Sequence, residues 1–217
     1  MIACEAETPS RREARREERR ACIVALAHRL FDEHGYGGTT MSAVAAALGG
    51  SKSTLWAYFA SKEELFGAVL DRLVTQFAPA IALDEEAPLE PTLVRYANDF
   101  LSMTLSPPII ALNRLVIGEA SRFPELGRLF YARGPERRHG VVAGYFAAQI
   151  ARGRLRPVDP LLASRQFHHL CHTGLFVRTL WSVEPTPDAA AIHQDAIDAV
   201  RLFLHGYGTE DASPAAD

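Results

Sequence analysis

The sequence predicts an all-α protein, with an N-terminal helix-turn-helix domain followed by a larger helical domain. Hydrophobic residues recur every three or four positions along most of the chain, and no run alternates as a half-buried strand would. Prolines, glycines and capping residues mark where the predicted helices begin and end. Residues 83–91, LDEEAPLEP, are acidic and contain two prolines, so they have the composition of an exposed linker between the two parts.

The first helix is predicted from a continuous apolar stripe and from the glycine that follows it. Positions i, i+3, i+4, i+7 and i+8 of the stripe are Ile23, Leu26, Ala27, Leu30 and Phe31. Gly35 is expected to end this helix, because glycine readily adopts the left-handed conformation that closes many last turns.

Two shorter helices are predicted next. The second helix begins after Thr40, a capping residue, and stops at the glycine pair 49–50. Its buried positions are expected to be Met41, Val44, Ala45 and Leu48. Ser51 is the expected cap of the third helix, in which Leu55 and Phe59 lie at i and i+4 and face the interior.

A fourth helix follows a capping box. Ser61 and Glu64 have the spacing at which each side chain can satisfy a backbone N–H of the other. The apolar face of this helix is formed by Leu65, Val69, Leu73 and Phe77. The helix is expected to stop at Pro79.

Prolines indicate the later helix starts, since proline at the first helical position loses no hydrogen bond. Pro135, Pro160 and Pro187 each follow a glycine or a capping residue. The whole chain is expected to form about nine or ten helices. Its predicted divisions are a charged, partly disordered arm at 1–19, a helix-turn-helix at 20–66, a connecting helix at 67–82, a larger domain at 83–208 and a disordered tail at 209–217.

Composition limits the class of protein. Hydrophobic residues make up 48% of the chain, which is typical of a globular protein. The net charge of −3 and the pI of 6.2 exclude a generally basic surface but not a local basic patch. The cysteines Cys4, Cys22 and Cys171 are scattered and odd in number, which does not indicate a disulfide framework. With no signal peptide and no membrane-length apolar run, the cytoplasm is the expected location.

Residues 49–62, GGSKSTLWAYFASK, combine small hydroxyls, aromatic rings and the chain's only two lysines, Lys52 and Lys62. In a DNA-binding helix-turn-helix, apolar side chains hold one face of the third helix while the other face enters the major groove. Small hydroxyls suit phosphates and base edges, and Ala57 suits a thymine methyl. The segment therefore predicts a DNA-reading helix. The alternative is a compact helical corner with Trp56 and Tyr58 in its core.

The stretch FDEHGYGGTTMSAVAAALGGSKSTLWAYFASKEELFGAV resembles the N-terminal domain of TetR-family transcriptional regulators. The resemblance rests on the phenylalanine-to-glycine end of the first helix, on GTT before the second, and on SKSTLWAYF followed by SKEELF. Gly50 and Trp56 depart from the usual pattern, and Ala57 lacks the larger side chain that often touches bases.

The resemblance implies which residues contact DNA. Phosphate contacts are implied for Thr40, Lys52, Tyr58 and Lys62. Groove contacts are implied for Ser51, Ser53, Thr54, Trp56 and Ala57. The charged segment RREARREERR at 11–20 has two interpretations: a solvated extension of the first helix with i,i+4 pairs, or an arm that reaches the flanking minor groove.

The second domain is similar to the C-terminal domain of the AefR-like subgroup of this family. The landmarks are GEASRFPELG, GPERR and RGRLRPVDP. The similarity implies a domain that binds a small-molecule effector and forms a homodimer. The predicted partners are therefore double-stranded operator DNA, a second copy of the chain and an effector that releases a repressor from DNA. No cofactor and no membrane partner is predicted.

Two sets of residues are assigned to these tasks. The apolar surplus of the last long helices, about 160–181 and 187–205, predicts a dimer interface that contains Phe167, Leu170, Trp181, Ile197, Val200, Phe203 and Leu204. A mostly apolar ligand is predicted among Phe100, Met103, Leu112, Leu115, Phe146 and Phe176. The alternative for the second set is that these side chains simply fill the core.

One sequence feature has the spacing of a metal site. In HHLCH, His168, Cys171 and His172 lie at i, i+3 and i+4 on one helical face. A metal-responsive regulator is thus an alternative function, although histidines on so apolar a helix are expected to be packed residues, and no metal is predicted. A small helical enzyme is a remote alternative, because the sequence contains neither a glycine-rich phosphate loop nor a nucleophile elbow.

Overall fold

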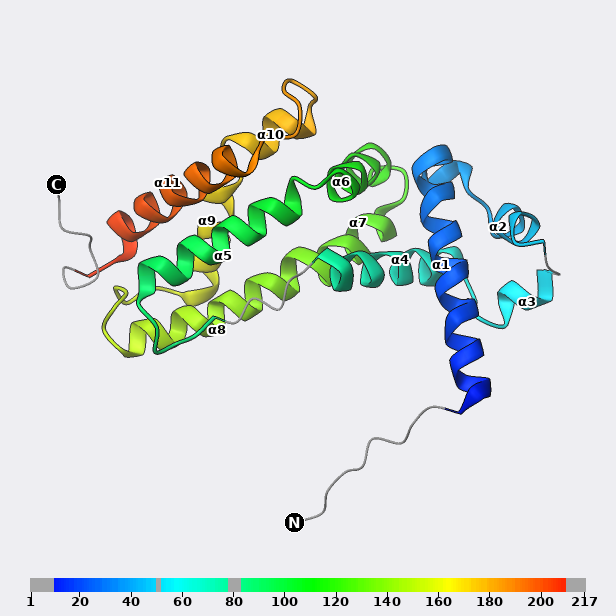
Figure 1. The fold of residues 1–217 in the computed structure, drawn as a ribbon, viewed down its shortest axis with the longest axis horizontal. Helices are drawn as coiled ribbons and strands as arrows, with labels where there is room; N and C mark the ends of the chain where they lie inside the picture. Colours follow the sequence, from blue (N-terminus) through cyan, green and yellow to red (C-terminus); the bar gives the residue numbers. More distant parts are fainter. Residues whose placement is uncertain (1–9, 50–51, 78–82, 210–217) are drawn as a thin grey trace, which may run out of the picture. The chain divides into compact units, whose positions relative to one another are not determined.

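The computed structural model describes residues 10–49, 52–77 and 83–209 (Figure 1). Within these ranges the chain forms eleven α-helices and one π-helical segment and has no strand, which confirms the predicted all-α fold. The chain divides into two compact units, Met1–Arg72 and Leu73–Asp217. No single helix in the described ranges has the length and apolarity to cross a membrane; only the bent pair Leu89–Thr104 and Pro107–Glu119 reaches both when taken together.

Helix α1 (Arg11–Gly38) begins earlier than predicted. The Glu13 N–H donates to Ser10 Oγ at 3.3 Å, and the Ser10 N–H donates to the Glu13 carboxylate at 2.7 Å. Hydrogen bonds from the Ser10 backbone and side chain also lower the pKa of Glu13. This capping box satisfies N–H groups at the helix start. Residues 11–19 therefore extend α1, which favours the helical interpretation of RREARREERR; the first nine residues of the predicted arm lie outside the described residues.

Gly35 interrupts the end of α1, where the sequence predicts a helix end. Its backbone has φ 71° and ψ 170°, a conformation that is essentially restricted to glycine. The Thr39 hydroxyl donates to the carbonyl oxygens of Leu30 and Gly35, at 2.9 and 2.8 Å. This buried threonine thereby fixes the path of the chain from α1 into the next helix.

We expect Gly35→Ala to lower the stability of the N-terminal unit by about 1–3 kcal/mol, because a Cβ disfavours this backbone conformation. Gly38→Ala is the matched control, since its new Cβ would meet only His34 Cβ at an ordinary 3.5 Å. Urea denaturation followed by Trp56 fluorescence, in a Trp181→Phe background, reports on this unit alone. Equal midpoints for the two alanine variants would contradict the prediction.

Helix α2 (Met41–Ala47) starts and stops where predicted. The Ala43 N–H donates to Thr40 Oγ1 at 3.1 Å, which confirms Thr40 as the cap. Gly49 has φ 64° and follows the last turn. Of the predicted interior positions, Val44 and Ala45 are buried, and Met41 and Leu48 are half-buried.

The core of the N-terminal unit contains a group of aromatic rings. The rings of Phe31, Tyr36 and Phe66 pack with centroids 5.4 to 5.7 Å apart. Leu55 in the short helix α3 (Lys52–Trp56) and Phe59 just after it are fully buried. The prediction that these two side chains face the interior is confirmed, but α3 ends at Trp56, so Phe59 does not lie in the helix as predicted.

Helix α4 (Lys62–Phe77) follows Ser61. The Glu64 N–H donates to Ser61 Oγ at 3.1 Å, while the Glu64 carboxylate accepts from the Ala60 N–H at 2.7 Å. The predicted capping pair is therefore present, with its return hydrogen bond moved by one residue. The division between the two units lies inside α4, within the range 67–82 that was assigned to a connecting helix. Pro79 lies outside the described residues.

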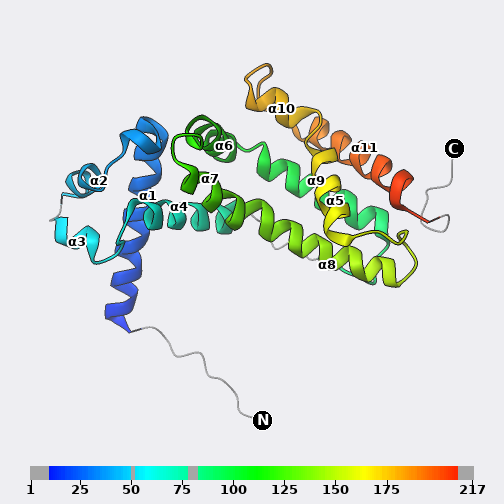
Figure 2. The same cartoon turned by 180° about the vertical axis from the view of Figure 1, so that it is seen from behind.

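The second unit is built from the helices that follow α4. They are α5 (Leu89–Thr104), α6 (Pro107–Glu119), α7 (Pro124–Tyr131), the π-helical segment η1 (Ala132–Glu136), α8 (Arg137–Ala151), α9 (Pro160–Cys171), α10 (Leu175–Leu180) and α11 (Ala189–Tyr207). Helix α11 packs along α5 and α9, and α9 packs on α8, as the two opposite views show (Figures 1 and 2).

Two of the helix starts predicted from proline differ in the structure. Pro160 begins α9 as predicted. Pro135 instead lies inside η1, so the chain is already helical there. Pro187 precedes α11, whose cap is Asp188: its carboxylate accepts from the Ala191 N–H at 2.8 Å. This side-chain cap fixes the helix start beyond the proline.

Rings from three helices form the centre of the second unit. The Phe203 centroid lies 5.0 Å from those of both Phe146 and Phe167. Phe146 and Phe167 are themselves 5.8 Å apart. Because these rings come from α8, α9 and α11, they join the three helices into one core.

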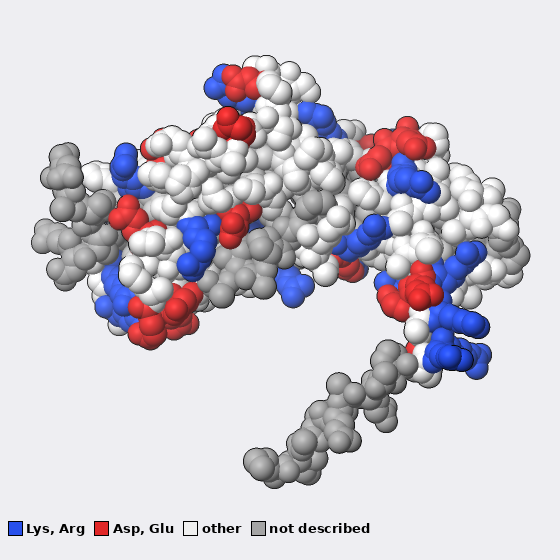
Figure 3. Space-filling model, viewed as in Figure 1, with Lys and Arg blue, Asp and Glu red and all other residues white. Residues whose placement is uncertain are grey.

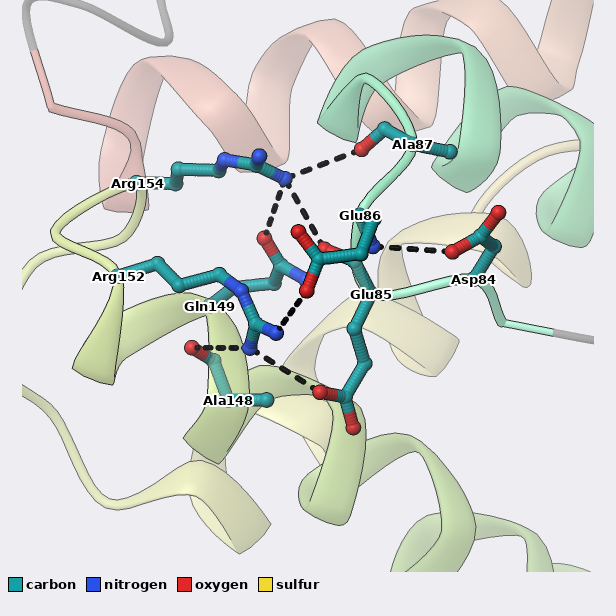
Figure 4. Close-up of polar contacts among 8 residues, drawn as sticks. All are labelled: Asp84, Glu85, Glu86, Ala87, Ala148, Gln149, Arg152 and Arg154. Carbon is teal, nitrogen blue, oxygen red and sulfur yellow. Dashed lines mark hydrogen bonds and ion pairs between the residues drawn. The ribbon is translucent and has the colours of Figure 1, made fainter.

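The acidic segment predicted as a linker is bound to the end of α8. Arg152 pairs with the carboxylates of Glu85 and Glu86 at 3.1 and 2.5 Å. Arg154 donates to the carbonyl oxygens of Glu85 and Ala87 at 3.1 and 3.0 Å (Figure 4). Residues 84–87 are therefore an ordered turn of the second unit, held by two arginines that lie far along the chain.

Candidate nucleic-acid interface

The structure places most of the predicted DNA contacts at the surface of the N-terminal unit. Ser51 and the side chain of Lys52 lie outside the described residues. Thr40, Ser53, Trp56 and Ala57 are exposed, and Thr54, Tyr58 and Lys62 are half-buried. Trp56 is 43% exposed, so the alternative of a core tryptophan is wrong. Thr40 accepts a hydrogen bond at the start of α2 and keeps its own hydroxyl hydrogen for a phosphate.

Helix α3 is short, and its end is shaped by a tight turn. The Ala57 N–H donates to the Ser53 carbonyl at 3.1 Å, and the N–H groups of Tyr58 and Phe59 both donate to the Leu55 carbonyl at 3.0 Å. Leu55 and Phe59 thus stay in the core while Ser53 and Ala57 remain on the solvent side. This is the arrangement that a groove-reading helix requires.

A basic groove lies beside this turn. It is lined by Arg12, Glu13, Arg15, Arg16, Arg19, Ala57 and Tyr58. The Arg16 guanidinium lies 6.0 Å from the Tyr58 ring centroid, and that of Arg20 lies 5.2 Å from the Phe59 ring. Figure 3 shows basic side chains gathered over the beginning of α1, with acidic ones beside them. We refer to Arg12, Arg15, Arg16 and Arg19 as the arginine row.

The arginine row was not identified from the sequence, although its signal is present there. The four arginines have the helical spacing i, i+3, i+4 and i+7, which places them on one face of α1. RREARREERR holds six arginines and three glutamates, a net charge of +3, but this sum does not show that four of the arginines share one helical face. Glu17 lies 3.9 Å from Arg20 rather than in the groove. Spacing therefore reveals a local basic patch that net charge does not.

Lys62 has a structural role in addition to its predicted phosphate contact. Its ammonium group donates to the Tyr36 carbonyl at 2.9 Å and lies 4.0 Å from the centroid of the Tyr36 ring. The Tyr36 hydroxyl also donates to the Glu63 carboxylate at 3.3 Å. Lys62 therefore ties the beginning of α4 to the end of α1, and its removal would affect stability as well as charge.

The predicted dimer residues divide by exposure. Phe167, Val200, Phe203 and Leu204 are buried in the core of a single protomer, so their assignment to an interface is wrong. Leu170 and Ile197 are half-buried, and Trp181 is 72% exposed. Exposed apolar side chains that were not predicted lie on the same two long helices, at Leu161 and Leu162 of α9 and Leu202 of α11.

The predicted ligand residues are not all in one place. Phe100, Leu112 and Phe146 are buried, and Met103, Leu115 and Phe176 are half-buried. Phe100 and Phe176 both stack on His172, at centroid distances of 4.9 and 4.1 Å, so these two do come together. Phe146 packs instead with Phe167 and Phe203, in another part of the same core. A surface cavity of about 390 Å³ between α6 and the end of α10 is lined by none of the six.

The HHLCH side chains are not arranged as a metal site. His168 Nδ1 lies 2.7 Å from the Ser164 carbonyl, which can only accept, so Nδ1 carries the hydrogen and Nε2 accepts from the Tyr96 hydroxyl at 2.7 Å. Burial raises the pKa of Cys171 to about 12, so its thiol stays protonated. The described residues contain no group of three or more side chains suited to hold a metal ion. The metal-responsive alternative is therefore not supported.

Two family models match the chain. The model described as "Bacterial regulatory proteins, tetR family" matches residues 23–69, and the model "AefR-like transcriptional repressor, C-terminal domain" matches residues 91–209. The chain belongs to the TetR family of transcriptional regulators. A TetR-family protein regulates transcription by binding DNA and is not an enzyme, which agrees with the exposed α3 face and the basic groove.

Curated relatives agree with this family. The HTH-type transcriptional repressor ComR of Escherichia coli (strain K12) is 41% identical over 90 residues, which cover 38% of this regulator and 43% of ComR. The HTH-type transcriptional regulator Mb1846 of Mycobacterium bovis is 32% identical over 163 residues, or 69% of this regulator and 64% of Mb1846. The chain thus spans less than two thirds of the length of either relative.

Solved structures of TetR-family proteins have the same fold. A TetR-family regulator from Mesorhizobium loti superposes with a TM-score of 0.77 at 28% identity, over 93% of this chain and 100% of that one. The flavonoid-responsive regulator FrrA superposes with a TM-score of 0.79 at 29% identity, over 89% of this chain and 99% of that one. Both similarities extend through the second unit as well as the first.

Proposed function

We propose that this TetR-family regulator binds a near-palindromic operator as a homodimer, acts as a repressor, and is released by a small, mostly apolar effector. The observation that carries the proposal is the basic groove in which the arginine row meets Tyr58 at the end of α3. Guanidinium groups beside a reading helix can hold DNA phosphates, and such contacts supply most of the affinity of a DNA-binding protein.

The contacts of this surface divide into positioning and reading. Thr40, Lys52, Tyr58 and Lys62 are assigned to phosphates, together with the arginine row. Ser51, Ser53, Thr54, Trp56 and Ala57 are assigned to the groove. Phosphate contacts fix the register of the protein on DNA, whereas contacts to base edges distinguish one sequence from another.

We expect Ser53→Ala and Thr54→Ala to change the preference among operator variants, by about 1–3 kcal/mol at the base pair that each one touches. Lys62→Ala should instead weaken binding to all sequences alike and lower the salt slope by about one unit per protomer. Selection from a randomised operator library, followed by affinity measurements at three salt concentrations, separates the two roles. An unchanged sequence preference in both hydroxyl variants would contradict the assignment.

The homodimer is proposed to form through the outer faces of α9 and α11. These helices pack on each other inside one protomer, and their exposed faces carry Leu161, Leu162 and Leu202. Apolar side chains gathered on an outer face are typical of a surface that another protein covers. A two-fold axis through such a face would give the dimer two DNA-binding units, one for each half-site of an operator.

We expect light scattering to show a dimer at micromolar concentration and Leu162→Glu with Leu202→Glu to give a monomer, because each charge would be buried in the interface. Ile117→Glu is the matched control, since Ile117 is an exposed apolar residue on α6. A monomeric wild-type protein, or a dimer that survives the double substitution, would contradict the proposed interface.

The effector is proposed to bind in the second unit near Phe100 and Phe176. Their stack with His172 offers aromatic surface, and Met103 packs against the same core. An apolar cleft with few polar groups is the usual site for a small organic ligand. The name of FrrA describes that relative as responsive to flavonoids, which supports an aromatic effector for this regulator too.

A further inference from the structure

Among the described residues of the second unit, three side chains contain a buried nitrogen atom without a hydrogen-bond partner. The atoms are Arg138 Nε, His139 Nδ1 and His172 Nε2. Most buried polar groups in folded proteins are paired, so each exception needs an explanation. Three exceptions that lie together indicate a site for a ligand with matching acceptor atoms.

The three side chains are joined through two rings. The Arg138 guanidinium lies 4.8 Å from the centroid of Phe100, and the His172 ring stacks on Phe100 at 4.9 Å. The His139 ring lies 4.9 Å from that of His168, which in turn lies 4.9 Å from Phe100. Helices α5, α8 and α9 therefore bring these groups into one contiguous cluster.

The cluster carries a positive charge that lacks a counter-ion. Among the described residues no carboxylate pairs with Arg138, and burial lowers the pKa of this guanidinium. Burial and the nearby Arg138 charge lower the pKa values of His139 and His172, the latter to about 3, so neither imidazole adds a charge at neutral pH. Arg138 is half-buried, and its buried Nε has no hydrogen-bond partner, so this part of the guanidinium loses hydration without compensation.

Local backbone structure also marks this place. The π-helical segment η1 ends at Glu136, directly before Arg137 begins α8. Short π-helical turns are rare and occur frequently at functional sites. Here the segment ends two residues before Arg138.

We propose that the cluster binds an aromatic organic acid as its anion, with the carboxylate on Arg138 and the ring beside Phe100, His172 and Phe176. This inference rests on the proposed function, in which the second unit holds an effector. A guanidinium binds a carboxylate through two parallel hydrogen bonds, which suits Arg138. The neutral imidazoles of His139 and His172 can donate to the same oxygens. Phe176 ends the stack that Phe100 and His172 form with it, and this half-buried ring supplies aromatic surface that an inorganic anion would not use.

Calorimetric titration of the full-length protein with 2-naphthoate and with 2-naphthamide tests the charge requirement. We expect 2-naphthoate to bind and Arg138→Met to weaken it about 10- to 100-fold, the worth of a charge-assisted hydrogen bond. Binding of the neutral amide should be weaker and unaffected by this substitution. Arg137→Met is the matched control, because Arg137 is exposed on the same turn. No binding of 2-naphthoate, or an equal loss for acid and amide, would overturn the proposal.

Thermal unfolding separates a binding arginine from a structural one. Arg138→Met removes a half-buried charge whose Nε has no hydrogen-bond partner, so we expect the Tm of the ligand-free protein to stay equal or rise. Addition of 2-naphthoate should raise the Tm of the wild type and of Arg137→Met but not that of Arg138→Met. A lower Tm in ligand-free Arg138→Met, with 2-naphthoate binding retained, would show that Arg138 serves the fold instead.

Operator binding distinguishes this inference from the function on which it rests. If 2-naphthoate binds through Arg138 but leaves operator affinity unchanged, the result supports the proposed acid-binding site and contradicts the proposal that this ligand releases the protein from its operator. If a neutral compound releases the operator equally well from the wild type and from Arg138→Met, the regulation stands and the acid site is overturned.

Discussion

Replacement of Arg16 and Arg19 by glutamine is expected to weaken operator binding about 10- to 100-fold near physiological salt. Both arginines line the basic groove beside Tyr58, at the end of the reading helix. Each lost phosphate contact also removes the release of condensed counterions, so the slope of log affinity against log salt should fall by about 1.8 units for one bound protomer and about 3.6 units for a dimer.

Fluorescence anisotropy at several salt concentrations measures both quantities. Arg29→Gln with Arg72→Gln is the matched control, because these exposed arginines of the same unit lie outside the groove and the change in net charge is equal. The control should keep the wild-type slope. A slope that falls equally in both double variants would mean that the arginine row acts only through overall charge.

Operator DNA is expected to weaken effector binding about 5- to 150-fold, the range of coupling energies of about 1–3 kcal/mol. An effector can release the protein from DNA only by its difference in affinity for the DNA-bound and free forms, and thermodynamic linkage makes the effect reciprocal. Helix α4 is shared by both units, so a ligand that displaces this helix can alter the spacing of the two DNA-binding units of the dimer.

A ligand found by thermal-shift screening allows this to be measured. Its affinity is titrated with free protein, with protein saturated by operator, and with protein mixed with unrelated DNA of equal length. Only the operator should lower the affinity. Equal affinities in all three titrations would show that the ligand does not control DNA binding.

The helix-turn-helix of the N-terminal unit could be predicted from sequence because its determinants are local. Leu55 and Phe59 are one helical turn apart, Thr40 is three residues from the N–H that it caps, and Gly35 breaks the helix in which it lies. Each follows from spacing and from the conformational preferences of single residues. The capping box of Ser10 and Glu13 is equally local, and the spacing of serine and glutamate three residues apart indicates it in the sequence.

The interface and ligand residues could not be predicted as well, because both depend on contacts between distant segments. Periodicity shows that α9 and α11 are rich in apolar residues, but it does not show which face meets the core. Phe167 and Phe203 face inward, whereas Leu162 and Leu202 face outward. An interface on a long apolar helix can therefore be assigned only when it is known which face of the helix packs against the core.

The polar contacts of His168 could not be predicted for the same reason. Tyr96 and His168 are 72 positions apart in the chain, and their hydrogen bond forms only because α5 and α9 lie in one core. HHLCH suggests a metal because two histidines and one cysteine share a helical face. Tyr96, which lies on another helix, forms a hydrogen bond with His168 instead, so His168 is a core residue with its polar atoms satisfied.

The most direct test of the account is the affinity of the wild-type protein for its own upstream DNA, compared with a scrambled duplex of equal length at physiological salt. The account predicts a preference of about 10³-fold or more, the usual margin of a specific DNA-binding protein, and a stoichiometry of two protomers per site. Equal affinity for the two duplexes would contradict the claim that the α3 face and the basic groove read an operator.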